Sequence, residues 1–209
     1  MLRTILITGA SSGIGAATAI AFANPNNRLI LVSRKNREGL KKIEDEGRER
    51  GAEVLSILAD VSDYEACKSL LAQANEHFGP IDLLINNAGI SHIGLFQDMT
   101  PDEWQRIMNV NIGSVMNLCH LVIPSMIHRH HGRIINISSV WGVCGASCEA
   151  AYSASKGGVG ALTQALAKEL APSGIQVNAI ACGAIDTDMN AFLSEDERAS
   201  FCLLYTSPS

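Results

Sequence analysis

The sequence lacks a surplus of positive charge and a long uninterrupted apolar run. Its sixteen Lys and Arg residues are outnumbered by twenty-one Asp and Glu residues, which gives a formal net charge of −5. No overall basic field therefore attracts nucleic acid, although this balance leaves room for a local basic patch. No stretch reaches the ~20 continuous apolar residues that a membrane-spanning helix needs. We expect neither nucleic acid nor a membrane among the partners.

Metal-binding patterns are also absent. The six cysteines show no Cys-x2-Cys pair or other ligand spacing, so we expect small buried side chains in a reducing, cytoplasmic environment. Cys144 and Cys148 flank the catalytic stretch described below, and a redox function there is a minor alternative to packing. His128, His130 and His131 have no acidic partner beside them, and cationic groups in a last helical turn favour the helix dipole. We predict no metal site.

The first residues resemble a secretory signal, because Arg3 precedes an apolar run and Ala-Phe-Ala follows at 21–23. However, the stretch TGASSG at 8–13 interrupts the apolar run, and cleavage would discard the most informative motif of the chain. We therefore predict a buried first strand.

Strand-like apolar runs alternate with helical patterns along the chain. At 209 residues and 47% hydrophobic, the chain has room for one core, and no repeat or linker divides it. The expected strands are Thr4–Ile7, Leu29–Val32, Val54–Leu58, Leu83–Ile85, Arg133–Ile137 and Gln176–Ile180. The expected helices are Gly13–Ala23, Glu38–Arg50, Asp63–Phe78, Pro101–His128 and Tyr152–Leu170. This alternation predicts an α/β fold, a doubly wound parallel sheet of the Rossmann type with three α/β/α layers. Ligands bind such sheets at the carboxyl ends of the strands.

The first of these strand ends carries a glycine-rich turn. Thr8, Gly9, Ser11, Ser12, Gly13, Ile14 and Gly15 stand between the first strand and the first helix. Glycines permit a tight turn and a close backbone approach, so a pyrophosphate can rest on free N–H groups at the positive end of the helix. The strand-turn-helix context makes this a dinucleotide site. A turn needed only for packing is the alternative.

Two later strand ends add cofactor contacts. Ser33 and Arg34 follow the second strand; an acid there would bind the ribose hydroxyls of NAD, whereas a cation accommodates the 2′-phosphate of NADPH. We therefore predict NADPH, against the alternative of an ordinary solvent-facing charge. Asp60 and Val61 end the third strand and are placed to meet the adenine, although Asp60 can equally cap the next helix. Asn87, Ala88 and Gly89 close the fourth strand, where small residues suit a backbone close to a ribose, or an ordinary turn.

The catalytic stretch is Ser139 to Lys156. Tyr152 and Lys156 are four residues apart in a helical pattern, so both side chains share one face. An ammonium ~4 Å from the phenol favours the phenolate by roughly 4 kcal/mol, which lowers the tyrosine pKa by about three units toward neutrality. A solvated helix face is the alternative for this pair. Ser139 ends the fifth strand and faces the same crevice, where it can hold a carbonyl oxygen. Asn111 is an Asn inside a helix, which is unfavourable without a task, and we predict a local kink there.

These motifs resemble the short-chain dehydrogenase/reductase family, in its classical subgroup. The resemblance rests on TGASSGIG at 8–15, Asp60, NNAG at 86–89, Asn111, Ser139, YSASK at 152–156, and Ile185 and Thr187. It implies a catalytic tetrad of Asn111, Ser139, Tyr152 and Lys156, with Lys156 also on the nicotinamide ribose and Asn111 holding a proton-relay water. It also implies cofactor contacts from Gly183, Ile185 and Thr187. Hydride would pass between nicotinamide and a substrate carbonyl while Tyr152 handles the proton.

Within the family, the chain is most similar to bacterial 3-oxoacyl-[acyl-carrier-protein] reductases. The segment from Ser138 to Glu149 also resembles a branch that includes the reductase of the 5-aminopentanone modification on elongation factor P. Both imply NADPH-dependent reduction of a small-molecule or carrier-bound ketone in the cytoplasm. Arg129 matches one basic position used for carrier docking, but Ser173 replaces the other. The resemblance implies a homodimer through the helices at 101–128 and 152–170.

The chain departs from the family pattern after the sixth strand. Cys182-Gly183 stands where Pro-Gly is usual, so the turn loses a fixed φ. The residues that follow lack the family's lid helices and final strand. We expect a domain over residues 1–201 whose last strand is missing, a non-matching tail over 202–209, and a doubtful tetramer.

Two other functions fit the same motifs. An NAD-linked alcohol or hydroxysteroid dehydrogenase differs in cofactor choice, which replacement of Arg34 by Asp would test. A nucleotide-binding sensory protein without catalysis is the alternative from another class, since a fold does not fix a function.

Overall fold

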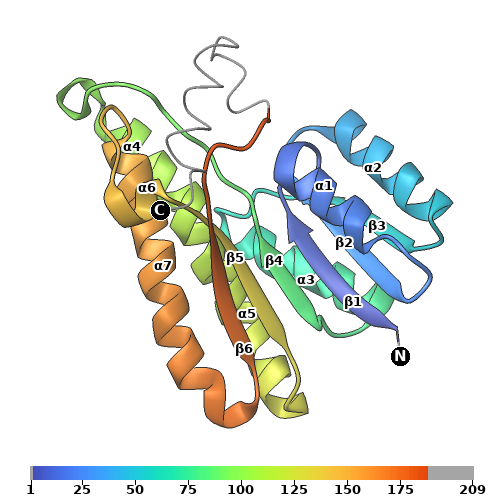
Figure 1. The fold of residues 1–209 in the computed structure, drawn as a ribbon. Helices are drawn as coiled ribbons and strands as arrows, with labels where there is room; N and C mark the ends of the chain where they lie inside the picture. Colours follow the sequence, from blue (N-terminus) through green and yellow to red (C-terminus); the bar gives the residue numbers. More distant parts are fainter. Residues whose placement is uncertain (1, 188–209) are drawn as a thin grey trace, which may run out of the picture.

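The computed structural model describes residues 2–187, which form a parallel six-stranded sheet with the strand order β3-β2-β1-β4-β5-β6 (Figure 1). The strands are β1 (Arg3–Thr8), β2 (Asn27–Ser33), β3 (Glu53–Leu58), β4 (Leu83–Asn86), β5 (Arg133–Ser139) and β6 (Gln176–Cys182). The chain leaves β1 to one side for β2 and β3 and then returns to the other side of β1 for β4, β5 and β6. This reversal makes the sheet doubly wound, and the predicted fold class is confirmed.

The helices are α1 (Gly13–Phe22), α2 (Arg37–Glu49), α3 (Tyr64–Phe78), α4 (Pro101–Met108), α5 (Ser114–Arg129), α6 (Trp141–Cys144) and α7 (Ala150–Leu170). The predicted strands and helices lie within three residues of the observed ones wherever both exist. One exception is the long helix predicted from Pro101, which a π-helical turn, Asn109–Gly113, divides into α4 and α5. The other is the short helix α6, which the sequence did not indicate.

Alternating residues of the strands face two different apolar cores. Leu6, Ile30 and Leu84 are fully buried on the face covered by α3, α5 and α7. Ile5 and Leu29 are buried on the opposite face, under α1 and α2. The prediction of helices on both faces is confirmed, but α1 and α2 lie over the β1, β2 and β3 half (Figure 1). Ile180 of β6 is 51% exposed, so this side of β6 is open among the described residues.

The run Pro101–Arg129 is long and apolar enough to cross a membrane by length and composition, the one such helix in residues 2–187. In the fold this run packs on the sheet: Val115, Leu118 and Met126 are buried in the core beside α3 and α7. The buried face is that of a core helix.

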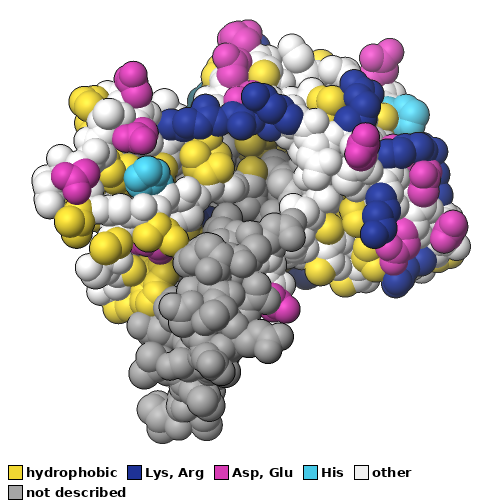
Figure 2. Space-filling view, turned by 90° about the horizontal axis from the view of Figure 1, so that it is seen from above, with side chains coloured by type: hydrophobic (Ala, Val, Ile, Leu, Met, Phe, Trp, Pro, Cys, Tyr) yellow, Lys and Arg dark blue, Asp and Glu magenta, His cyan; other side chains and the backbone are white. Residues whose placement is uncertain are grey.

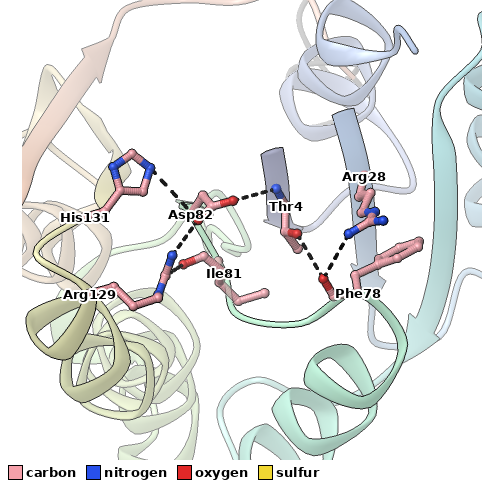
Figure 3. Close-up of polar contacts among 7 residues, drawn as sticks. All are labelled: Thr4, Arg28, Phe78, Ile81, Asp82, Arg129 and His131. Atoms are coloured by element: carbon pink, nitrogen blue, oxygen red, sulfur yellow. Dashed lines mark hydrogen bonds and ion pairs between the residues drawn. The ribbon is translucent and has the colours of Figure 1, made fainter. Parts of the chain in front are cut away.

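The amino ends of the strands are closed by a polar cluster around Asp82 (Figure 3). One carboxylate oxygen of Asp82 accepts from the Arg129 guanidinium at 2.7 Å, and the other accepts from the backbone N–H of Thr4 at 3.0 Å. Arg129 also donates to the carbonyl of Ile81 at 2.6 Å, while His131 Nε2 lies 4.0 Å from Asp82. This cluster joins β1, the β4 entrance and the end of α5.

Candidate active site

The glycine-rich turn lies between the carboxyl end of β1 and the start of α1. Gly9 and Gly13 have φ angles of +64° and +54°, which residues with a side chain rarely adopt. A Cβ on Gly15 would collide with the carbonyl oxygen of Gly9. Ser12 occupies the N-cap position of α1, but its side chain makes no capping hydrogen bond. The first N–H groups of α1 therefore face the turn, where a phosphate can accept from them.

Thr8 and Asn87 lock this turn to the end of β4. The Thr8 hydroxyl accepts from the backbone N–H groups of Asn87 and Ala88, each at 2.9 Å. The Asn87 amide donates to the carbonyls of Thr8 and Gly9 at 2.9 and 3.2 Å. Asn87 still lines the cleft described below, whereas Thr8 is fully engaged by its neighbours. Thr8 therefore positions the turn from beneath.

The ends of β2 and β3 meet beside the same turn. Ser33 Oγ donates to Ser11 Oγ at 3.1 Å, and the Arg34 guanidinium lies 3.8 Å from an Asp60 oxygen. The other Asp60 oxygen accepts from the backbone N–H of Ser62. Asp60 does not cap α3, because Asp63 does so through the N–H of Ala66.

Val61 follows β3, and its side chain lies in the core and not in the lining of the cleft. Its side chain is 6% exposed and belongs to the core under α3, beside Cys67. Its carbonyl accepts hydrogen bonds from the Cys67 thiol and from the Asn117 amide. The predicted contact of Val61 with an adenine stays a prediction, and the side chain packs in the core because an apolar side chain at this strand end has an apolar core to enter.

Ser139, Tyr152 and Lys156 come together at the carboxyl end of β5. Ser139 ends the strand and is 6% exposed, while Tyr152 and Lys156 lie one turn apart on α7. The Lys156 ammonium lies 5.8 Å from the centre of the Tyr152 ring and donates to the carbonyl of Ile137 at 2.7 Å. The three side chains line one cleft together with the glycine-rich turn.

The pKa of Tyr152 shifts in the direction opposite to the predicted one. Burial raises the pKa of Tyr152; a hydrogen bond with Ser139 lowers it, and the charge of Glu149 raises it further. The prediction that the pKa of Tyr152 falls toward neutrality is therefore wrong, because loss of water around the phenol outweighs the effects that lower it. Lys156 is affected most: burial lowers its pKa to about 8. Its ammonium donates to a backbone carbonyl, and no carboxylate of residues 2–187 forms an ion pair with it.

Asn111 lies in the π-helical turn, as its unfavourable helix position predicted. Its amide oxygen accepts from the N–H of Ile90 at 2.8 Å, and its amide nitrogen donates to the Ile90 carbonyl and to Ser155 Oγ, both at 2.9 Å. Ser155 in turn donates to the carbonyl of Tyr152. The side chain of Asn111 is 1% exposed and does not line the cleft. It ties the segment after β4 to the helix that carries Tyr152 and Lys156, which is a positioning role.

The cleft has a volume of about 1020 Å³, a size suited to a large ligand. Its lining includes Gly9, Ser11, Ser12, Gly13, Ile14, Asn87, Ala88, Gly89, Ser139, Tyr152, Lys156, Gly183, Ile185 and Thr187. The other predicted site residues are not part of this lining: Thr8, Gly15, Ser33, Arg34, Asp60, Val61 and Asn111. In Figure 2, charges of both signs mix on the α2 side, whereas apolar side chains gather on the side of α4 and α6. Ile93, Phe96 and Val143 are exposed there.

Cys182 is the residue that replaces the expected proline after β6. It lines the cleft, and its pKa is raised by burial and lowered by Lys156. Cys144 and Cys148 are free, as are the other cysteines of the described chain, and Cys148 has a φ of +62°. Three or more His, Cys, Asp or Glu side chains do not gather into a metal-ligand group anywhere in residues 2–187.

The sequence analysis assigned no role to three residues near the cleft, Ser138, Ser91 and Glu149. Ser138 Oγ donates to the backbone carbonyl of Lys156 at 3.0 Å and joins β5 to α7. Ser91 Oγ donates to a carboxylate oxygen of Glu149 at 2.7 Å at the other end of the cleft. The sequence carries no signal for these two contacts, because Ser138 follows the strand predicted at 133–137 and Ser91 lies in no predicted element. The partners themselves lie 18 and 58 positions away in the chain.

A doubly wound sheet with a glycine-rich phosphate turn and a serine, tyrosine and lysine at its carboxyl edge defines a nucleotide-dependent oxidoreductase site. Residues 3–198 match the sequence model of the family described as short chain dehydrogenase, and the chain belongs to this family. It is an NAD(P)-dependent oxidoreductase.

Two curated relatives illustrate the similarity. An acetoacetyl-CoA reductase of Shinella zoogloeoides is 42% identical over 189 residues, which are 90% of this chain and 76% of that protein. A 3-oxoacyl-[acyl-carrier-protein] reductase FabG of Thermotoga maritima is 39% identical over 198 residues, 94% of this chain and 79% of that protein. The chain is also 39% identical over 197 residues to the FabG reductase of Escherichia coli, so it is similar to several FabG reductases.

Two solved structures share the fold. A single-residue variant of the actinorhodin polyketide ketoreductase, with NADPH, has a TM-score of 0.88 at 34% identity, and the match covers 99% of this chain and 78% of that one. The NAD+-bound xylitol dehydrogenase has a TM-score of 0.82 at 38% identity, with 86% and 69% covered. The two neighbours carry different cofactors, so likeness of fold leaves the choice between NADH and NADPH open.

Proposed function

We propose that the protein reduces a ketone to a secondary alcohol with NADPH, and that its substrate is a 3-oxoacyl thioester or a related small ketone. The observation that carries this proposal is the placement of Ser139, Tyr152 and Lys156 on the same cleft as the glycine-rich turn. When bound, NADPH supplies a hydride to the carbonyl carbon. The remaining steps belong to the side chains of this chain.

The residues fit these steps. The Ser139 hydroxyl is buried beside Tyr152 and can donate to a carbonyl oxygen that enters the cleft. Tyr152 then gives its phenolic proton to that oxygen as the charge develops. Its raised pKa keeps the proton on the phenol at neutral pH, as a general acid for reduction requires. Lys156 supplies a positive charge beside the phenol, which favours the phenolate left after the transfer.

The empty space at the glycines fits a dinucleotide. Side chains at Gly9, Gly13 and Gly15 would fill or strain the turn, and the unsatisfied N–H groups of α1 face it. Gly89 leaves room beside both Asn111 and Lys156, since a Cβ there would contact both side chains at about 3.5 Å. We assign the pyrophosphate to residues 9–15, the nicotinamide ribose to Tyr152 and Lys156, and flanking contacts to Ala88, Gly183, Ile185 and Thr187.

NADPH is favoured over NADH because Arg34 follows β2 where a 2′-phosphate would lie, beside Ser11 and Ser33. The test is the ratio of catalytic efficiencies with NADPH and NADH. Arg34→Asp should lower this ratio at least tenfold, since it replaces a phosphate partner by a like charge. Arg28→Asp, a change on the same strand at the opposite sheet edge, should leave the ratio within twofold. An unchanged ratio in Arg34→Asp would contradict the assignment.

The xylitol dehydrogenase neighbour supports a second candidate, an NAD-linked alcohol dehydrogenase. One assay separates the two candidates: acetoacetyl-CoA with NADPH is compared with xylitol and simple secondary alcohols with NAD+. We expect faster turnover of the thioester. Faster oxidation of the alcohols, with NAD+ preferred, would favour the second candidate. Binding of both cofactors without turnover of any ketone or alcohol would favour a sensory function.

Carrier-protein docking through Arg129 has less support than the chemistry. Arg129 is held by Asp82 and the Ile81 carbonyl, and its side chain is 24% exposed. An arginine engaged in this way stabilises the fold and offers little charge to an acidic partner. We therefore propose a small thioester or small ketone ahead of a carrier-bound one.

We further propose a cytoplasmic homodimer that uses the outer faces of α5 and α7. Met116 and Ile127 of α5 are 52% and 39% exposed, and eleven residues, about three helical turns, place both side chains on one face of the helix. Light scattering after size exclusion should give twice the chain mass, and a Met116→Lys variant should give the mass of one chain.

A further inference from the structure

A chain of buried polar side chains crosses the core between β4, β5 and α7. The Asn86 amide donates to Asn136 Oδ1 at 2.8 Å, and Asn136 Nδ2 donates to Thr163 Oγ1 at 2.9 Å. Thr163 completes the chain with a hydrogen bond to the carbonyl of Val159, one turn earlier in α7. All three polar side chains are buried, Asn136 completely, and none of them belongs to the lining of the cleft. Any role of these residues in the reaction is therefore indirect.

Asn136 occupies a position that an apolar residue would fill at a lower cost. It lies on the face of β5 that packs against α7, because side chains two apart in a strand share a face and Ile134 is buried in that core. An amide there is stable only when its donors and acceptors are paired. Apolar packing has no direction, whereas a hydrogen bond fixes one relative position of two elements. The paired amide therefore specifies where α7 lies along β5.

A second hydrogen bond holds the same helix nearer to its catalytic end. Ser138, on the same face of β5 as Asn136, donates to the backbone carbonyl of Lys156 at 3.0 Å. Lys156 and Thr163 are seven residues apart, about two helical turns, so β5 holds one face of α7 at two points. Tyr152 lies one further turn toward the start of the helix. The place of its phenol therefore depends on the place of the helix.

The other end of the polar chain leads to the glycine-rich turn. Asn86 is the last residue of β4, and the next residue, Asn87, bonds to Thr8 at the start of that turn. The chain thus joins the side of the cleft assigned to the cofactor to the helix that carries Tyr152. A hydride donor and a proton donor must reach the same carbonyl group, and a misplacement of about 1 Å can lower a rate ~10²-fold.

We propose that Asn136 and Thr163 are positioning residues for the reduction. Their hydrogen bond sets the register of α7 on β5 and so places the Tyr152 phenol against a ketone bound beside the glycine-rich turn. This inference rests on the proposed function and adds to it two residues outside the cleft. No proton or electron passes through them.

The test is Thr163→Val, which removes the hydroxyl and keeps the size of the side chain. The measured quantity is the rate of NADPH oxidation in a single turnover with saturating acetoacetyl-CoA, per folded molecule. We expect this rate to fall about 10- to 100-fold, because the phenol is displaced from the carbonyl oxygen. The affinity for NADPH should change less than about threefold, since the glycine-rich turn is intact. Thr163→Ser keeps the hydroxyl and should stay within about threefold of the wild-type rate.

A second background separates positioning from a general loss of structure. Tyr152→Phe has no phenolic proton to place, so adding Thr163→Val to it should lower the remaining rate by less than about threefold. Equal fold-losses in the two backgrounds would overturn the proposal, and so would a wild-type rate in Thr163→Val.

Thr4→Val is the matched control. It removes a hydroxyl that is also buried, and that donates to the Phe78 carbonyl at the amino ends of the strands. Its single-turnover rate should equal that of wild type, and a loss as large as that of Thr163→Val would overturn the proposal.

If Thr163→Val does not fold, Ser138→Ala removes the other hydrogen bond between β5 and α7, and the same two backgrounds give the same test. If wild type reduces acetoacetyl-CoA and the losses in the two backgrounds are equal, this inference fails and the proposed function stands. If wild type reduces no ketone, both fail.

Discussion

The amino and carboxyl ends of the parallel strands form two edges of the sheet, and these edges differ in whether charged side chains are paired. At the amino edge, Asp82 pairs with Arg129 and accepts from the N–H of Thr4, so that one carboxylate joins three elements (Figure 3). At the carboxyl edge, Lys156 is buried without a carboxylate partner and Glu149 has no cation partner in the described chain. The same parallel strands supply both edges. Closed networks at the amino edge hold the fold, and groups left available at the carboxyl edge are placed for a ligand.

Two side chains at the carboxyl edge also have shifted pKa values. Burial lowers the pKa of Lys156 to about 8 and raises that of Tyr152. The fold therefore favours the neutral form of both side chains. Such perturbation is typical of sites that use the groups in chemistry. If this contrast is correct, substitutions at the carboxyl edge cost activity and substitutions at the amino edge cost stability.

The largest effect is expected from Tyr152→Phe. Loss of the phenolic proton should lower kcat for ketone reduction by ~10² to 10⁴-fold, the usual span for a general acid. NADPH affinity and the free energy of unfolding should stay close to wild type, because the ring is kept. Steady-state kinetics and denaturant titration measure the two quantities. A variant with wild-type kcat would remove Tyr152 from the mechanism and break the comparison at its carboxyl end.

At the amino edge, Asp82→Ala should lower the free energy of unfolding by about 2 to 3 kcal/mol, because it leaves Arg129 Nη1 and the Thr4 N–H without their acceptor and the Arg129 charge without its counter-ion in a largely buried place. Turnover per folded molecule should be unchanged. Glu65→Ala is the matched control, since its pair with Lys68 is exposed to solvent and its loss should change the free energy of unfolding far less. Equal losses in the two variants would show that the amino edge is no better closed than the rest of the surface.

A smaller effect concerns pH and Lys156. Its pKa is about 8 in the folded protein and 10.5 without the fold, so between these values the unfolded chain binds the extra proton. Stability from this group therefore rises with pH, by about 1 kcal/mol between pH 8 and pH 9. The unfolding free energy of wild type minus that of Lys156→Met should therefore increase by about 1 kcal/mol from pH 8 to pH 9. A flat difference would contradict a depressed pKa at the carboxyl edge.

The smallest effect is expected for His131→Ala. The imidazole is 66% exposed and 4.0 Å from Asp82, so its loss should change the unfolding free energy by less than about 0.5 kcal/mol at neutral pH. A loss as large as that of Asp82→Ala, measured in the same titration, would place the histidine inside the closed cluster and redraw its limits.

The sheet and most helices were predictable because their signal is local. Continuous apolar strands separated by amphipathic segments leave few topologies, and the glycines at 9, 13 and 15 mark a turn by their own conformational needs. The groups that come together at the carboxyl edge were also predictable, because parallel strand ends meet at one edge.

Burial and long-range partners were not predictable in the same way. The direction of the Tyr152 pKa depends on how much water the fold removes, and the spacing of Tyr152 and Lys156 does not report this. Arg129 looked free in the sequence, since Asp82 lies 47 positions away. Glu149 escaped notice because its partner Ser91 comes from another element. The predicted boundary between residues 1–201 and 202–209, and the final strand, lie outside the described residues.

The central claim is that the carboxyl edge transfers a hydride from NADPH to a ketone carbon. Turnover of acetoacetyl-CoA with NADPH that carries deuterium at both C4 positions of the nicotinamide, followed by mass spectrometry of the alcohol, tests it directly. We expect one deuterium on the carbinol carbon of each product molecule. An alcohol product without deuterium, or no alcohol at all, would contradict the account.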